Sequence, residues 1–252
     1  LKINTINDIG LFPIIEKRDL REVWDLGYRQ GLFRRGWTAQ TAGTTGEPTK
    51  VFHDLHVRAT QLARRWACNG VHGITPGDRE ARLWARSQFG WRSALVDVAA
   101  NRRVYSLNDG GDSQTQLDLA AFVSSGADFV YGYSSLILRA AEALESMQST
   151  MNVKAVIYTA EMLYGFQVKA IRKAFACPIV SEYGCTEIDI IARECAAGAL
   201  HVMSPDIIVE IMDENGCCSF EGHGEVVVTD LNNLTMPIVR YRLGDIAEVG
   251  PD

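Results

Sequence analysis

Small hydroxyl residues, glycines and a lysine gather in the stretch TAGTTGEPTK, residues 41–50. Glycines allow several backbone N–H groups to converge on an anion, and threonine hydroxyls add further hydrogen-bond donors. Lys50 would add a full positive charge, and a helix that begins near residue 53 would add the partial positive charge of its N-terminus. These residue types suit a phosphate-binding loop and a solvated surface turn equally well.

The stretch matches neither of the two common nucleotide-binding motifs. The pattern G-x-x-x-x-G-K-[ST] fails because Gly46 is followed by Glu47 and Gly43 has no second glycine five residues later. The pattern G-x-G-x-x-G fails because the two glycines stand alone. Backbone N–H groups can cradle a phosphate outside either pattern, so the stretch alone leaves both interpretations open.

Two further stretches carry polar side chains beside a glycine. YGCTE, residues 183–187, follows a predicted strand, and YRLGD, residues 241–245, lies in the β-type end of the chain. Each has a structural alternative, because Thr186 would suit a helix N-cap and Asp245 would suit a turn after Gly244. In isolation, the structural alternative is the better interpretation of both stretches.

The elements that must position these residues alternate through most of the chain. Residues 51–71 have apolar side chains at helical spacing, with His53 or Asp54 as the candidate N-cap. Strands then alternate with helices of about a dozen residues, which is typical of parallel βαβ units. The predicted strands are 79–86, 103–107, 127–133, 153–160 and 177–184, and the predicted helices are 91–100, 114–124, 135–148 and 164–175.

The last part of the chain changes character. Short β-type runs there are broken by Asn-Gly, Gly-His-Gly and Leu-Gly-Asp turns. We therefore expect an α/β fold with mostly parallel sheet layers over about residues 1–190, followed by a β-rich subdomain over about 191–252. A chain of 252 residues is long enough for one large or two modest domains.

Composition and charge argue against several classes of function. The chain is 47% hydrophobic and 22% charged, as an ordinary globular protein is. Its net charge of −6 argues against nucleic acid or an anionic membrane as the main partner. No apolar run approaches the ~18 residues of a membrane span, and the start lacks the apolar core of a signal peptide. Six cysteines without CxxC spacing favour a reducing compartment, so we expect a cytoplasmic protein.

Taken together and in order, the three polar stretches resemble one family, the adenylate-forming enzymes, which include acyl-CoA synthetases, standalone adenylation domains and luciferases. The resemblance is strongest to the branch of phenylacetate–CoA ligase and CapK, and it covers nearly all of residues 11–249. Each motif alone is weak evidence for the family. The resemblance rests on all of them occurring in the same order and at suitable spacing. The other matching blocks are LFPIIEKRDLRE (11–22), AVIYTAEMLY (155–164), ECAAGALHV (194–202), DIIVEIMDENG (206–216) and GEVVVTDLNNLTMPIVRYRLGD (224–245).

The resemblance implies the N-terminal core of an adenylate-forming enzyme over residues 1–252, with a distorted barrel as its β-rich part. Ala160 and Glu161, at the end of a predicted strand, would line the adenine pocket, at the sheet edge where open α/β sheets bind ligands. The loop that closes over the β- and γ-phosphates of ATP would contain Thr41, Gly43, Thr44, Thr45, Gly46 and Lys50.

The resemblance also implies the groups that hold the rest of the nucleotide. Tyr183 and Gly184 would flank the adenine, because a rigid aromatic face stacks cheaply. Thr186 and Glu187 would be the catalytic residues, with Thr186 donating to the α-phosphate and Glu187 holding Mg²⁺. Asp245 would accept hydrogen bonds from both ribose hydroxyls.

The implied reaction is the activation of a carboxylic acid by ATP. The acid attacks the α-phosphorus to give an acyl-adenylate and pyrophosphate, and the acyl group then passes to a thiol, with coenzyme A as the leading acceptor. One alternative keeps the adenylate chemistry but transfers the acyl group to an amine, a sugar or a carrier protein. A second alternative is a nucleotide-binding module without turnover. The sequence gives no indication of the oligomeric state.

The sequence departs from the family pattern in two places. The family's small C-terminal domain, which carries a catalytic lysine, has no counterpart before residue 252, so we expect this chain to bind nucleotide but to adenylate poorly. Lys50 stands one residue later than in the common TGxPK pattern, which makes it a less certain phosphate ligand.

The residues that contact the acyl group are less readable. Phe89, Trp91, Tyr131 and Tyr133 would suit an aryl or apolar acid, although aromatic residues at such spacing are more often core residues. Parts of the branch carry a structural zinc, for which Cys195 and His201 are the candidate ligands here. An inert thiol and an ordinary histidine are the favoured interpretation of that pair.

Overall fold

The computed structural model describes residues 5–41, 48–84, 91–107 and 113–250. The chain divides into two compact units, and each contains segments that are distant in sequence. The first unit comprises Leu1–Ala63, Cys185–Ile191 and Val202–Asp252, and the second comprises Arg64–Gly184 and Ala192–His201. The division predicted from the sequence, near residue 190, stays a prediction.

Parallel strands linked by helices make up most of the second unit, and the sheet that they form also includes residues 185, 189–191 and 202 of the first unit. A seven-stranded sheet has the order β4-β3-β5-β6-β7-β8-β9, and β3 pairs in parallel with both β4 and β5, β5 with β6, and β6 with β7. The strands are β3 (Glu80–Leu83), β4 (Arg102–Tyr105), β5 (Phe129–Tyr133), β6 (Val156–Thr159), β7 (Ile179–Cys185), β8 (Asp189–Glu194) and β9 (Leu200–Val202), and the helices are α3 (Trp91–Ala99), α4 (Ser113–Val123), α5 (Ser134–Ser146) and α6 (Gly165–Phe175).

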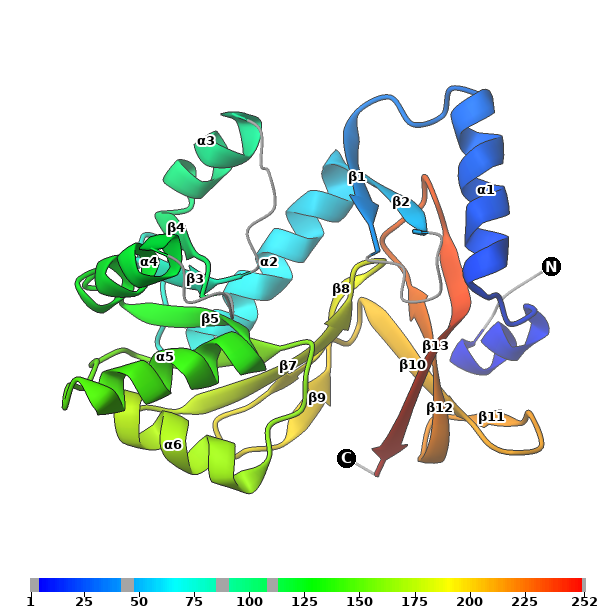
Figure 1. Ribbon diagram of the computed structural model, residues 1–252. Helices are drawn as coiled ribbons and strands as arrows, with labels where there is room; N and C mark the ends of the chain where they lie inside the picture. The colour runs from blue at the N-terminus through cyan, green and yellow to red at the C-terminus, as the bar shows by residue number, and fades with distance from the viewer. Residues whose placement is uncertain (1–4, 42–47, 85–90, 108–112, 251–252) are drawn as a thin grey trace. The chain divides into compact units, whose positions relative to one another are not determined.

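Helical spacing of apolar residues fixes how α5 meets the sheet. Its buried residues recur at intervals of one, three and four, which places them on one face of the helix: Leu136, Ile137, Ala140, Ala141 and Leu144. They join one core cluster with residues of α6 such as Phe175 and with strand residues such as Val130 and Val156. Figure 1 shows α5 and α6 side by side along the sheet. Full burial of one such side chain stabilises the fold by about 1.5–3 kcal/mol.

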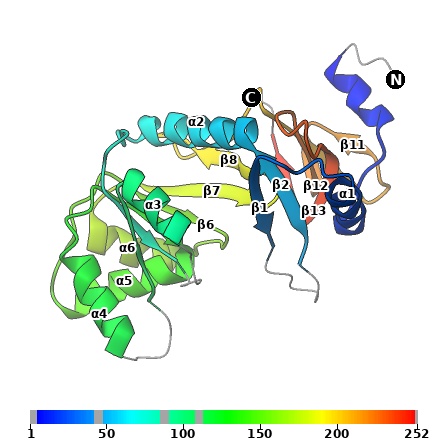
Figure 2. The same cartoon turned by 90° about the horizontal axis from the view of Figure 1, so that it is seen from above.

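The first unit is mainly antiparallel. Strands β10 (Ile207–Met212), β11 (Cys218–Ser219), β12 (Gly222–Asp230) and β13 (Ile238–Val249) form a sheet of order β11-β10-β12-β13. Strands β1 (Gly36–Gln40) and β2 (Lys50–Asp54) form a second, two-stranded antiparallel sheet, shown from above in Figure 2. A 3₁₀ helix (Ile6–Leu11) and α1 (Lys17–Arg29) precede them, and α1 packs against β2. Helix α2 (Leu55–Val71) follows β2 directly and continues into the second unit.

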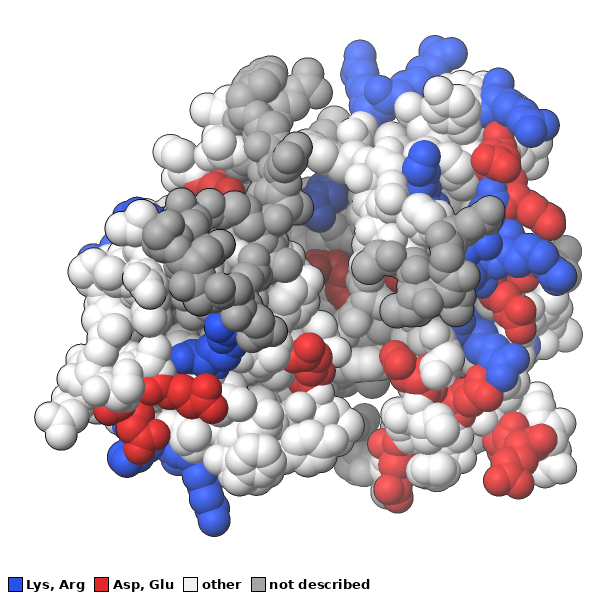
Figure 3. All heavy atoms as spheres, viewed as in Figure 1, with Lys and Arg blue, Asp and Glu red and all other residues white. Residues whose placement is uncertain are grey.

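Charged side chains of both signs lie over α1 on the face seen in Figure 3. The helix sequence KRDLREVWDLGYR explains this mixture, since acidic and basic residues are interspersed along it. In the described residues, no helix is long and apolar enough to cross a membrane.

Most of the elements predicted from the sequence are present within a few residues of the expected bounds. The predicted helix after the 41–50 stretch begins at Leu55, and Asp54 is its N-cap because Oδ1 of Asp54 accepts the Val57 amide at 2.9 Å. Residues 50–54 form strand β2, which the helical pattern did not predict. Val51, Phe52 and His53 are all buried, and such a short run without alternation does not distinguish a strand from a helix start.

Candidate functional site

The YGCTE stretch ends one strand and begins a tight turn. Tyr183, Gly184 and Cys185 are the last three residues of β7, and residues 186–188 form a turn before β8 begins at Asp189. The alternative in which Thr186 caps a helix is therefore wrong, because the chain continues as a strand. Thr186 is exposed, whereas the side chain of Glu187 points inward.

Glu187 is a buried carboxylate surrounded by neutral donors. Its residue is 3% exposed, and the Tyr241 hydroxyl donates to Oε1 at 2.8 Å. The Cys185 thiol also hydrogen-bonds to this carboxylate. Burial and the charge of Glu187 raise the pKa of Tyr241 and that of Cys185, so both groups keep their protons and act as donors at neutral pH.

No lysine or arginine of the described residues forms an ion pair with Glu187. A buried carboxylate costs free energy unless a cation or a metal ion compensates its charge. The hard oxygens of a carboxylate suit Mg²⁺. Glu187 therefore fits the cation that the family resemblance implies. Within the described part of the chain, no group of three or more His, Cys, Asp and Glu side chains gathers to hold a metal ion, so Glu187 would share Mg²⁺ with ligand oxygens and water.

Two side chains that the sequence did not indicate as site residues form hydrogen bonds with main-chain oxygens of the turn that carries Glu187. Nε2 of His53, on β2, lies 2.9 Å from the main-chain oxygen of Glu187. Because a carbonyl oxygen can only accept, Nε2 carries the proton and donates. Nε2 of Gln61, on α2, donates to the oxygen of Ile188 at 3.3 Å. His53 is 3% exposed, and its burial lowers its pKa.

Asp245 lies on β13 at an irregularity of the β12–β13 pairing. The register shifts between Glu225 and Val227, so the residues around Gly244 and Asp245 form a bulge. Gly244 has φ +88°, a left-handed conformation that glycine adopts without strain. Bulges re-aim side chains, and Asp245 is exposed, which suits a ligand contact. Arg242, three residues earlier, is fixed by an ion pair with Glu225.

The ends of the 41–50 stretch are joined by two hydrogen bonds. The Thr41 amide donates to the oxygen of Thr49 at 3.0 Å, and the Thr49 amide donates to Oγ1 of Thr41 at 3.0 Å. Lys50 begins β2, and its ammonium lies 5.9 Å from the centroid of the Trp24 ring. Four of the predicted loop residues lie outside the described residues: Gly43, Thr44, Thr45 and Gly46. Their phosphate-binding role stays a prediction.

Ala160 and Glu161 stand at the carboxyl end of β6, in the second unit. Ala160 has φ +71°, a conformation that is costly for a residue with a Cβ and that clusters at functional sites. The carboxylate of Glu161 accepts the Ser135 amide at 3.0 Å, and the Glu161 oxygen accepts the Ser134 hydroxyl at 2.6 Å. Glu161 thus caps the start of α5, and the adenine contact predicted for it stays a prediction.

The aromatic residues predicted to line the acyl pocket have divided roles. Tyr131 is 6% exposed, and its hydroxyl donates to Glu182 at 2.6 Å, so it belongs to a buried polar network. Tyr133 is half-buried and stacks on Trp84, with ring centroids 3.9 Å apart. Phe89 lies outside the described residues, as does the side chain of Trp91.

Cys195 and His201 are brought together, as the zinc hypothesis requires. Hydrogen bonds from the Ala199 and Ala197 amides and from His201 lower the pKa of the Cys195 thiol. Zinc in a structural site needs four ligands, and in the described residues no third ligand joins the pair. The geometry is that of a tight turn closed by the Cys195 amide bonding to Ala199 at 2.9 Å.

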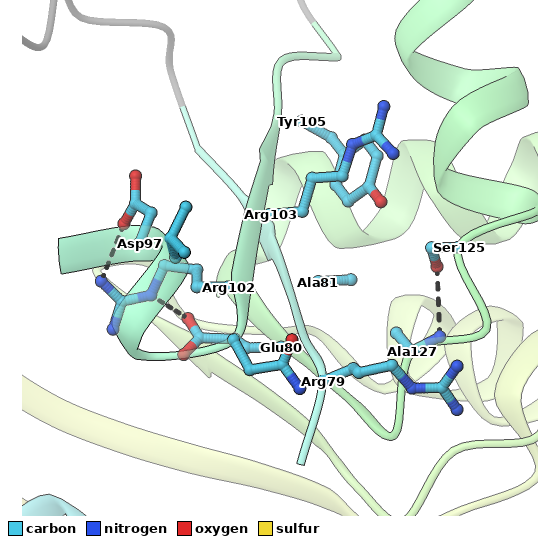
Figure 4. Close-up of a pocket in the computed structure, with 11 residues that line it drawn as sticks. Arg79, Glu80, Ala81, Asp97, Arg102, Arg103, Tyr105, Ser125 and Ala127 are labelled. Carbon is cyan, nitrogen blue, oxygen red and sulfur yellow. Dashed lines mark hydrogen bonds and ion pairs between the residues drawn. The ribbon is translucent and has the colours of Figure 1, made fainter. Parts of the chain in front are cut away.

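Two pockets lie apart from the predicted site residues. The pocket in Figure 4, with a volume of about 310 Å³, lies at the amino ends of β3 and β4, where Arg102 forms ion pairs with Glu80 at 3.1 Å and with Asp97 at 3.3 Å. Parallel sheets bind ligands at the carboxyl ends of their strands, so this pocket is on the less favoured edge. A pocket of about 450 Å³ in the first unit is lined by Leu32, Arg34, Arg35, Phe52, Asp54 and Thr235.

Comparison with known proteins finds three curated relatives. The chain is 27% identical over 215 residues to indoleacetate–lysine synthetase of Pseudomonas savastanoi, covering 82% of this chain and 52% of that protein. It is 22% identical over 265 residues to protein CapK of Staphylococcus aureus, covering 97% of this chain and 55% of that protein. It is 25% identical over 268 residues to phenylacetate–coenzyme A ligase of Aromatoleum evansii, covering 99% of this chain and 59% of that protein. The chain therefore spans about half the length of the curated relatives it matches, and no family model matches it.

A comparison of folds agrees at the level of the fold. A crystal structure of 2-hydroxyisobutyryl-CoA ligase in complex with 2-HIB-AMP and CoA superposes with a TM-score of 0.73 at 16% identity, covering 94% of this chain and 59% of that one. The resemblance to adenylate-forming enzymes of the phenylacetate–CoA ligase and CapK branch is thus confirmed, and so is the predicted α/β fold of their N-terminal core.

Proposed function

We propose that this chain, a relative of the adenylate-forming enzymes, activates a carboxylic acid with ATP to an acyl-adenylate and releases pyrophosphate. The observation that carries the proposal is the environment of Glu187, a buried carboxylate that meets only neutral donors among the described residues. Its position in the YGCTE stretch is the one for which the family resemblance implies a Mg²⁺ ligand.

Each predicted residue has one task in this reaction. Glu187 holds the cation, and Thr186, exposed on the same turn, donates to the α-phosphate. Asp245, displaced by the β13 bulge, accepts from the ribose hydroxyls. Mg²⁺ held by Glu187 would neutralise charge on the phosphate oxygens. Phosphoryl-group chemistry of this kind depends mainly on positioning and charge neutralisation, which is what these side chains supply.

The acyl acceptor is a second part of the proposal. Coenzyme A is the leading candidate, because phenylacetate–coenzyme A ligase is a relative and the superposed structure of 2-hydroxyisobutyryl-CoA ligase holds CoA. The relative named indoleacetate–lysine synthetase supports the alternative of an amine acceptor. An aryl or apolar acid is the proposed substrate class, and a cytoplasmic location, where ATP and coenzyme A are available, stays the expectation from cysteine usage.

Pyrophosphate exchange into ATP, measured with a panel of aryl, fatty and amino acids, tests the proposal. We expect slow exchange with at least one aryl or apolar acid, because this chain is expected to adenylate poorly, and no exchange without Mg²⁺. Binding of a non-hydrolysable acyl-sulfamoyl adenosine, measured by calorimetry, is the companion assay. Binding without exchange for any acid would favour a nucleotide-binding module without turnover, and absence of both would refute the proposed function.

A further inference from the structure

We propose that His53 is a positioning residue, which orients Glu187 toward its cation by a hydrogen bond to the Glu187 main chain. Tyr241 orients the Glu187 carboxylate directly. The inference rests on the proposed function of Glu187 as the Mg²⁺ ligand. His53 and Tyr241 do not touch substrate or cation in this scheme. They act only through the geometry of Glu187.

The first contact fixes the backbone. Nε2–H of His53 donates to the oxygen of Glu187 at 2.9 Å, across 134 residues of sequence. A turn is otherwise free to rotate its peptide planes, and rotation of this plane would swing the Glu187 side chain. The neighbouring oxygen of Ile188 is held by Gln61 at 3.3 Å, so two successive peptide groups of the turn are fixed from one side.

The second contact fixes the side chain. The hydroxyl of Tyr241, on β13, donates to Oε1 of Glu187 at 2.8 Å. A glutamate has three rotatable bonds, and a hydrogen bond at its tip together with one at its main chain removes most of that freedom. Carboxylates that bind metal ions are commonly oriented by such outer hydrogen bonds, whose loss typically lowers metal affinity by about 10–100-fold.

His53 can act in this way because its own strand is held firmly. Nδ2 of Asn233 donates to the oxygen of Phe52 at 3.0 Å, and Oδ1 of Asn233 accepts the Met236 amide at 3.0 Å. The Phe52 amide in turn donates to Sδ of Met236 at 3.3 Å. This closed set of bonds fastens β2 to the segment between β12 and β13, which leads into Tyr241. The two donors that hold Glu187 therefore belong to one rigid frame.

The test compares His53→Leu, which removes the donor, with His53→Gln, whose amide N–H can reach the same oxygen. Binding of ATP to the full chain is measured by calorimetry with Mg²⁺ and with EDTA. Mg²⁺ should raise the ATP affinity of the unmodified chain, and we expect this gain to be about tenfold smaller in His53→Leu. Binding of ATP in EDTA should not change, and His53→Gln should restore the gain. Tyr241→Phe should show the same selective loss, and it provides a variant that keeps the fold if His53→Leu does not.

The matched control is His72→Leu. Nε2 of His72 also bonds to the main-chain oxygen of a glutamate, Glu194, at 3.0 Å, but that residue has no place in the proposed site. His72→Leu should leave the Mg²⁺-dependent gain unchanged. An equal loss of ATP affinity with Mg²⁺ and with EDTA in His53→Leu, or no loss in either His53→Leu or Tyr241→Phe, would overturn the inference.

A second measurement separates this inference from the proposed function. The Ile188 amide donates to the oxygen of Cys185 at 3.3 Å across the turn, so its hydrogen exchange reports on turn rigidity without any ligand. We expect about tenfold faster exchange in His53→Leu and recovery in His53→Gln. If the unmodified chain binds no Mg·ATP, the proposed function fails, yet this exchange pattern would still support positioning by His53. Unchanged exchange in His53→Leu would refute it.

Discussion

Two buried glutamates, five residues apart, have opposite environments. Glu182 on β7 accepts from the Tyr131 hydroxyl and forms ion pairs with Arg193 and, at 3.6 Å, with Arg65. Glu187 meets a phenol and a thiol, and no ion pair with it forms in the described residues. The protein compensates the charge at Glu182, whereas the charge at Glu187 is the one that we propose Mg²⁺ compensates. A buried charge that only a ligand would compensate lowers the stability of the folded chain when the ligand is absent.

Glu187→Gln should therefore separate stability from function. An uncharged amide of the same shape keeps an oxygen for Tyr241 and removes the uncompensated charge, so the free energy of unfolding should stay equal or rise by about 1 kcal/mol. Mg²⁺-dependent ATP binding should be lost. Glu182→Gln is the comparison, because it leaves a buried arginine partly unpaired and should cost about 3–5 kcal/mol. Urea unfolding of both variants measures the difference, and equal destabilisation would contradict this account of Glu187.

At the scale of elements, polar side chains at strand and helix ends hold the secondary structure in register. Asp54 ends β2 and caps α2, and it also accepts the Thr235 hydroxyl at 2.5 Å. Glu80 begins β3 and forms ion pairs with Arg82 at 2.6 Å and with Arg102 of β4 at 3.1 Å. Both carboxylates lie where an element starts or ends, so their loss should affect folding rather than ligand binding.

Asp54→Ala should destabilise the chain by about 1–2 kcal/mol, because the first-turn amide of Val57 loses its acceptor and Thr235 loses its partner. Asp54→Asn should recover most of that loss, since asparagine caps helices about as well as aspartate. Thermal unfolding of the two variants measures the difference. A similar loss in both would show that the charge of Asp54, and not the cap, is what matters.

Glu80 should make stability depend on acid pH. Burial alone would raise the pKa of Glu80, but the charges and hydrogen bonds of Arg82 and Arg102 outweigh it and hold the pKa below its usual value of 4.5. The folded chain therefore binds fewer protons than the unfolded chain near that pKa. The stabilisation is complete above about pH 5 and is lost as the pH falls below 4.5.

Urea unfolding at pH 6.0 and 3.5 should show that Glu80→Gln is less stable than the unmodified chain at the higher pH and that its stability falls less on acidification. Glu145→Gln is the control, because Glu145 and its partner Lys173 are both largely exposed and such pairs contribute little. Parallel pH profiles for Glu80→Gln and the unmodified chain would contradict the assignment.

At the scale of the whole molecule, the proposed reaction needs contacts to different parts of one nucleotide. The family resemblance assigns Thr44 and Thr45 to the β- and γ-phosphates, which leave as pyrophosphate, and Asp245 to the ribose, which stays with the adenylate. These contacts should be separable by comparing ATP with AMP, because AMP has no β- or γ-phosphate.

Replacing both Thr44 and Thr45 with valine should weaken ATP use by about tenfold or more while leaving AMP binding nearly intact, since only donors to the leaving phosphates are removed. Asp245→Ala should weaken ATP and AMP binding equally, because both contain the ribose. Calorimetry with each nucleotide, together with pyrophosphate exchange, makes the comparison. Equal loss of ATP and AMP in the threonine variant would mean that the 41–50 stretch has been misassigned.

The sequence alone determined the regular part of the fold and the positions of the polar stretches. The helices near 135–148 and 164–175 and the parallel strands between them follow from local periodicity, which depends on residues close together in the chain. Motif order was sufficient for the family resemblance, since a motif is a property of residue identity and spacing.

Only the tertiary structure decided how Glu187 is held. His53 offers no local pattern that marks it as a site residue, because its partner is 134 residues away and the contact is to a main-chain oxygen whose residue type is irrelevant. The same holds for the left-handed Ala160 and for the bulge at Asp245, which depend on the register of paired strands. Local sequence fixes elements, whereas contacts between distant elements determine which polar groups are compensated and which remain available to a ligand.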